Sequence, residues 1–162
     1  MGEARFVVNA SPLIFLSRVD ALPLLSKLAS QVMVPAAVVA EVHAEGKWSS
    51  FSKGVEIPGW IRIEPDLPIP EEISGWDLGA GESQVLVHAS FMSDSEAVLD
   101  DLQARRCARS LGIPTTGTLG VILRAKQRGL IPEARPLVEA LIQNQMYISR
   151  ELVETALADV GE

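Results

Sequence analysis

The stretch Ala97-Val-Leu-Asp-Asp-Leu-Gln-Ala-Arg-Arg-Cys-Ala-Arg109 joins a short apolar run to a helix-like segment through two consecutive acids. The apolar run ends at Leu99, and Asp100 and Asp101 follow it directly. In α/β proteins, ligands bind at the carboxyl ends of the parallel strands, so acids in this position face a crevice instead of the core. The stretch therefore predicts a strand followed by a helix, with a functional acid at their junction.

The composition is that of an ordinary globular protein. The chain has 162 residues, of which 48% are hydrophobic and 22% charged, and it carries a net charge of −7. We expect one domain over residues 1–162, with the C-terminal helices of residues 133–160 packing on it. No apolar run approaches the about 20 residues that span a bilayer, and the N-terminus lacks a signal sequence, so we expect a cytoplasmic protein. The acidity argues against a nucleic-acid coat protein but not against an enzyme that acts on nucleic acid.

Short apolar runs alternate with helical stretches along the whole chain. This alternation predicts an α/β/α sandwich, with a short central parallel sheet flanked by helices. The run from Glu45 to Pro58 is expected to be a loop, and Ser11 is expected to cap the first helix. Strands are expected at residues 6–8, 31–34, 60–63, 97–99 and 113–115. Helices are expected from Ser11, near Pro23, and over residues 36–44, 82–91, 100–111, 117–127, 133–144 and 151–160.

Four polar residues share a predicted position near one edge of this sheet. Asn9 ends the first strand, Glu41 lies on the helix after the second strand, and Glu82 lies in the first turn of its own helix. Asp101, beside Asp100, follows a later strand. Hard divalent cations such as Mg²⁺ prefer oxygen ligands and take one or two carboxylates directly. The set therefore predicts a metal site suited to hydrolysing a phosphodiester.

Each of these acids also has an ordinary structural explanation. Glu41 alone is typical of a solvated helix residue, and an acid such as Glu82 is favoured in a first turn by the helix dipole. One acid of the Asp pair is expected to be an N-cap. We assign the capping role, alone or shared, to Asp100 and the metal role to Asp101. For Arg105, an ion pair with Asp101 four residues earlier is favoured over a contact with RNA.

Five runs, in the same order along nearly the whole chain, resemble the PIN domain, and more narrowly a prokaryotic branch of PIN-like proteins. The runs are Phe6-Val-Val-Asn-Ala-Ser-Pro-Leu-Ile14, Val34-Pro-Ala-Ala-Val-Val-Ala-Glu-Val42, Gly79-Ala-Gly-Glu-Ser-Gln-Val-Leu-Val87, Leu99-Asp-Asp-x-x-Ala-Arg105 and Gly117-Thr-Leu-Gly-Val-Ile-Leu123.

The resemblance implies a metal-dependent ribonuclease that uses Mg²⁺ or Mn²⁺. Many PIN domains are toxins of toxin–antitoxin pairs, which cleave RNA and are silenced by a partner protein. For this chain the resemblance therefore implies an RNA substrate, an antitoxin partner and a homodimer. The apolar residues Leu13–Phe15 and the C-terminal helix are the candidate dimer surfaces.

The family's site residues fall on identifiable positions of this chain. Its first-strand acid falls on Asn9, its helix glutamate on Glu41, its third acid on Glu82 and its fourth on Asp101. These four residues are the predicted catalytic and metal-binding set.

Three further residues are expected to support this set or contact the substrate. They are Ser11, which falls where the family often has a small hydroxyl, and Asp100 and Arg105. Asn9 departs from the usual aspartate, because it keeps a carbonyl oxygen but loses the charge that strengthens metal binding. A second hypothesis therefore stands beside the ribonuclease: a catalytically weak or inactive PIN-like module that binds RNA or a protein.

Overall fold

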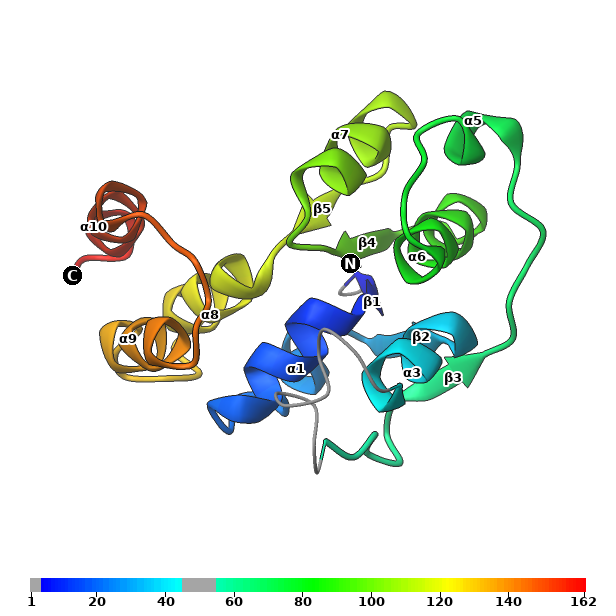
Figure 1. Ribbon diagram of the computed structural model, residues 1–162. Helices are drawn as coiled ribbons and strands as arrows, with labels where there is room; N and C mark the ends of the chain where they lie inside the picture. The colour runs from blue at the N-terminus through cyan, green and yellow to red at the C-terminus, as the bar shows by residue number, and fades with distance from the viewer. Residues whose placement is uncertain (1–3, 45–54) are drawn as a thin grey trace.

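The computed structural model describes residues 4–44 and 55–162, in which a parallel sheet lies between layers of helices (Figure 1). Every paired strand runs parallel to its neighbour, as expected when helices connect successive strands. The predicted α/β/α sandwich with a short central sheet is confirmed. In sheet order, the strands are β3 (Arg62–Glu64), β2 (Gln31–Pro35), β1 (Arg5–Val8), β4 (Ser95–Val98) and β5 (Thr115–Thr116).

Helices pack on both faces of the sheet. On one face, α8 (Thr118–Gln127) contacts α1 (Ala10–Arg18), α2 (Leu24–Leu28) and α9 (Arg135–Gln143), and α1 also contacts α9. On the other face, α6 (Ala80–Phe91) crosses β1, β2 and β4 and contacts α5 (Glu71–Ser74) and α7 (Leu102–Ser110). The helix α3 (Ala36–His43) contacts both α1 and α6, and α10 (Arg150–Asp159) lies beside α8 and α9 (Figure 1).

The central position of β1 in the sheet explains why its sequence is continuously apolar. Phe6, Val7 and Val8 are fully buried, because helices cover both faces of this strand. A charged pair lies beside it: Arg124 on α8 donates two hydrogen bonds, of 3.1 and 2.7 Å, to the carboxylate of Glu96 on β4. The Arg124 guanidinium also lies 5.7 Å from the centre of the Phe6 ring, so the cation is both paired and stacked.

Several sequence expectations need correction. The first helix begins at Ala10, and Asn9, not Ser11, occupies its N-cap position. The last strand covers only Thr115–Thr116, and the helix α5 was not expected. Leu13 and Phe15 are buried, so the predicted dimer surface over residues 13–15 lies inside the fold.

Two further expectations concern the loop after α3 and the absence of a membrane-spanning segment. Most of the loop expected between residues 45 and 58 lies outside the described residues. In the parts of the chain that are described, none of the helices has the length and apolar character needed to cross a membrane.

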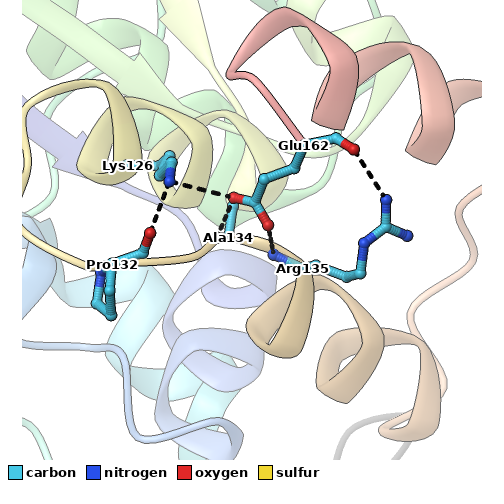
Figure 2. Close-up of polar contacts among 5 residues, drawn as sticks. All are labelled: Lys126, Pro132, Ala134, Arg135 and Glu162. Atoms are coloured by element: carbon cyan, nitrogen blue, oxygen red, sulfur yellow. Dashed lines mark hydrogen bonds and ion pairs between the residues drawn. The ribbon is translucent and has the colours of Figure 1, made fainter.

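The last residue, Glu162, holds the start of α9 in place (Figure 2). Its carboxylate accepts hydrogen bonds from the backbone N–H groups of Ala134, at 2.6 Å, and Arg135, at 3.1 Å. Lys126 lies 3.8 Å from the same carboxylate and donates a hydrogen bond to the Pro132 carbonyl. Ala134 occupies the N-cap position and has no side-chain acceptor. Glu162, 28 residues later in the chain, therefore supplies the acceptor that a capping side chain normally provides.

The contacts of Glu162 make its contribution to stability depend on pH. The hydrogen bond from Ala134 lowers the pKa of its carboxyl group; burial opposes this, and the Arg135 N–H and the charges of Lys126 and Arg135 reinforce it. A lowered pKa in the folded state means that the stabilisation is complete above the ordinary value of 4.5 and is lost as pH falls through the lower folded value.

We therefore expect Glu162→Gln to lower the melting temperature at pH 7, and the difference from wild type to shrink as pH falls below 4.5. Thermal melts between pH 3 and pH 8 measure this. Glu139→Gln, at an exposed position on α9 away from Glu162, is the matched control and should leave the melting temperature unchanged. A difference that stays constant down to pH 3 would show that the ionised form of Glu162 does not stabilise the fold.

Candidate functional site at the carboxyl edge of the sheet

The parallel register brings three distant chain segments to the same edge of the sheet. Val8, Val98 and Thr116 are neighbours at the ends of β1, β4 and β5. The pairing continues one residue further, since the Asn9 N–H donates to the Val98 carbonyl at 3.1 Å and the Leu99 N–H donates to the Thr116 carbonyl at 2.8 Å. The residues that follow these three strands therefore meet although they are about 90 and 110 positions apart.

Asp100 is the acid that faces the other segments at this edge. Its carboxylate accepts three hydrogen bonds of 2.7 Å each, from the Ser11 hydroxyl, the Thr118 hydroxyl and the Thr118 N–H. Ser11 lies in the first turn of α1, and Thr118 is the first residue of α8. One half-buried carboxylate thus connects the starts of two helices and has a fixed orientation.

Asp101 has the role that the sequence analysis gave to Asp100. It is exposed and is the N-cap of α7, where its carboxylate accepts a 2.9 Å hydrogen bond from the Ala104 N–H. The capping assignment to Asp100 was wrong, because an N-cap carboxylate must directly precede the first helical residue, Leu102, to reach this N–H. The metal role of Asp101 stays a prediction.

The ion pair expected between Asp101 and Arg105 does not form within the described part of the chain. With the Asp101 carboxylate engaged in capping, the Arg105 side chain extends toward the start of α8. A Cβ atom placed on Gly117 would lie 3.5 Å from Arg105 Nη1. The guanidinium therefore lies near the carboxylate of Asp100 without being paired to it.

Asn9 carries an unused acceptor in a buried position. The residue is 5% exposed, and within residues 4–44 and 55–162 its Oδ1 is the only buried side-chain nitrogen or oxygen without a hydrogen bond. An Asn at an N-cap normally accepts from the second or third residue of the helix, but the third residue here is Pro12, which has no N–H. A buried acceptor left without a donor costs about 1–3 kcal/mol and is typical of a site for an ion or water.

The carboxylates of Glu41 and Glu82 both lie at the start of α6. Glu41, on α3, accepts a 2.9 Å hydrogen bond from the Gly81 N–H, and Glu82 accepts a 3.2 Å hydrogen bond from the Gly79 N–H. Together with Asp101, each of the three predicted metal-binding acids already accepts a backbone N–H at a helix start. Among the residues described, no three His, Cys, Asp or Glu side chains come together closely enough to hold a metal ion.

Two glycines leave the room that the acids occupy. A Cβ atom on Gly81 would lie 2.7 Å from Glu41 Oε1, and one on Gly117 would lie 2.9 Å from Asp100 Oδ1. Neither distance is compatible with a real side chain unless the carboxylate moves. Sequence reasoning missed this function of Gly81 and Gly117, although both glycines lie in the runs that carry the family resemblance.

The fold and this edge define a class of α/β protein whose site consists of oxygen-bearing side chains at the carboxyl ends of parallel strands. Residues 5–162 match the sequence model of a family described as the PIN domain. The chain therefore belongs to the PIN-domain family, as the resemblance implied, and has a nuclease-type fold. The comparison with curated proteins gave no match. Nucleic acid is the class of partner that a PIN domain implies.

We expect Gly117→Ala to displace the Asp100 carboxylate from Thr118. Because Gly117 has an extended backbone with φ of −112°, alanine adds no backbone strain and the effect is steric alone. Loss of hydrogen bonds to a charged acceptor should lower the free energy of unfolding by about 1–3 kcal/mol, measured by urea denaturation.

Gly59→Ala is the matched control, since no atom lies within 4 Å of a Cβ atom at that position. It should leave the free energy of unfolding near that of wild type. If Gly117→Ala were as stable as wild type, with Asp100 still bound to Thr118 in its crystal structure, the steric argument would fail.

Proposed function

We propose that this protein is a metal-dependent ribonuclease and that Asn9 and Asp100 form the centre of its site. The observation that carries the proposal is the buried Asn9 Oδ1, which has no hydrogen-bond donor within the described residues. It lies at the end of the strand next to the one that Asp100 follows. Such an oxygen is a suitable ligand for a divalent cation, and divalent metals are the general cofactors of PIN domains.

The donors at this edge fit Mg²⁺ or Mn²⁺. Both ions prefer oxygen, and Mg²⁺ takes one or two carboxylates while keeping several waters, so a cluster of three acids is not required. Asn9 and Asp100 would hold the ion, and Glu41 and Glu82, on the neighbouring helices, would add negative charge around its waters. We favour Asp100 over Asp101 because Asp100 faces the converging segments, whereas Asp101 is exposed and caps α7.

The side chains around Asp100 have distinct tasks in phosphodiester hydrolysis. When bound, the metal supplies neutralisation of the phosphoryl oxygens and a more acidic water. Ser11 and Thr118 fix the orientation of the Asp100 carboxylate through three hydrogen bonds. Arg105, which has no acid partner within the described residues, would bind an oxygen of the scissile phosphate through a charge-assisted hydrogen bond.

A second candidate function has its own support. Asn9 is neutral, and Glu41, Glu82 and Asp101 each accept a backbone N–H, which is the arrangement expected of a PIN-like module that binds RNA or a protein without cleaving it. The toxin role, the antitoxin partner and the homodimer are further proposals, which rest on the family resemblance.

Cleavage of a labelled single-stranded RNA, with Mg²⁺, with Mn²⁺ and with EDTA, tests the proposal. We expect cleavage only with metal, and we expect Asp100→Asn to reduce the rate by roughly 100-fold, the order of loss that follows removal of one preorganised electrostatic contact from an active site. Asp100→Asn should preserve the fold, because the amide oxygen can accept from the Thr118 N–H and the amide nitrogen can donate to the hydroxyls of Ser11 and Thr118. Asp101→Asn is the matched control and should keep most of the activity, since Asn also caps helices.

Asn9→Asp tests the metal site without relying on cleavage. A second carboxylate beside Asp100 should destabilise the metal-free protein through like-charge repulsion and burial. Added Mn²⁺ should then raise the melting temperature of Asn9→Asp by more than that of wild type, because binding only to the folded state stabilises it. No metal-dependent cleavage and no Mn²⁺ effect on either protein would favour the non-catalytic module.

A further inference from the structure

The helix α7 presents an arginine-rich face to solvent. Arg105, Arg106 and Arg109 share this face with Leu102, because residues three and four apart are neighbours on a helix surface. The opposite face, with Ala104, Cys107 and Ala108, is buried. A groove of about 690 Å³ separates the arginine face from residues 112–115, which lead into β5.

These arginines lack the acid partners that other arginines of the chain have. Within residues 4–44 and 55–162, none of the three forms an ion pair, and their one hydrogen bond joins Arg106 to Gln103 at 3.1 Å. By contrast, other arginines pair with acids, among them Arg62, Arg124, Arg135 and Arg150. In a chain of net charge −7, three cations without an ion pair along one groove form a local positive surface suited to an anionic polymer.

Arg105 connects this groove to a second, more apolar cleft. The second cleft has a volume of about 420 Å³, begins at Asp100 and Arg105, and runs between α8 and the segment before α10. Leu123 lines it on one side and Met146 and Ile148 on the other. Tyr147, at 95% exposure, also lines it, so an aromatic ring stands free at its edge. The segment that carries these residues lies beside α8 in the ribbon (Figure 1).

We infer that one strand of RNA occupies both depressions, with its phosphates along the α7 arginines and an unpaired base in the apolar cleft against Tyr147. The inference rests on the proposed function, because it places the scissile phosphate between the two, at Asp100 and Arg105. Single-stranded nucleic acid is bound by this combination of a basic groove and aromatic side chains on which bases stack. A base held in a duplex cannot enter such a cleft, so the strand on this path must be unpaired where it meets Tyr147.

Binding without cleavage tests the strand path separately from catalysis. The probe is a fluorescently labelled 12-nucleotide single-stranded RNA in EDTA, and its Kd is measured by anisotropy at several salt concentrations. Arg106→Ala/Arg109→Ala should raise the Kd about tenfold or more at low salt. It should also reduce the slope of log K against log salt by about 1.4, since each phosphate contact in a single strand contributes about 0.7.

Two more changes separate charge from stacking. Tyr147→Ala should raise the Kd by roughly 5- to 100-fold with almost no change in salt slope, because it removes a base contact and no charge. Arg106→Lys/Arg109→Lys should keep most of the salt slope. Lys27→Ala/Arg150→Ala, at exposed positions on α2 and α10, is the matched control for loss of two positive charges and should leave the slope unchanged.

Three results would overturn the strand path. They are an unchanged Kd and slope in Arg106→Ala/Arg109→Ala, equal binding of a 12-base-pair RNA duplex, and tighter binding of an acidic peptide than of RNA at this groove. The last would identify a protein as the partner. If RNA binds as inferred but Mg²⁺ and Mn²⁺ support no cleavage, the path stands and the nuclease proposal fails. If Asp100→Asn abolishes cleavage but the α7 variants bind RNA as wild type does, the reverse holds.

Discussion

Three hydrogen bonds to the Asp100 carboxylate hold the carboxyl edge of the sheet together. They connect the end of β4 to the first turns of α1 and α8, which begin after β1 and β5. The contact depends on Gly117, because any Cβ atom at that position would displace the carboxylate. Asp100 is therefore a structural connector and also the carboxylate that we propose as a metal ligand, and a substitution there must separate these two contributions.

Asn9 is the second polar residue at this edge and follows β1, the strand next to β4. Its side chain occupies an N-cap position but cannot cap the third residue of the helix, since Pro12 removes the N–H that it would bind. The cost of about 1–3 kcal/mol for an unused buried acceptor is a substantial part of the stability of a typical domain. Binding a cation would offset that cost, which gives a physical reason for an asparagine whose Oδ1 is buried and caps no helix N–H.

The fold was largely predictable from the sequence, because apolar runs alternate with helical periodicity and each parallel strand needs a helical connection. The edge location of Asn9 followed from the same pattern. The capping role was assigned to Asp100 but belongs to Asp101, because a shift of one residue decides which side chain caps α7 and the sequence pattern does not fix the last strand residue. Nor could spacing reveal that Glu41 accepts the Gly81 N–H, since this contact joins residues 40 positions apart.

On α7, one capping contact leaves Arg105 free of an ion pair within the described residues. Sequence spacing favoured an ion pair between Asp101 and Arg105, but capping engages the Asp101 carboxylate. Arg105 then extends toward Asp100, where it borders both the basic groove and the apolar cleft.

Anomalous scattering from a crystal of the protein soaked in Mn²⁺ would show directly whether the ion binds at Asn9 and Asp100. We expect a peak within bonding distance of Asn9 Oδ1 and the Asp100 carboxylate. A peak at Asp101 alone, or no peak at this edge of the sheet, would show that Asn9 and Asp100 do not form the metal site.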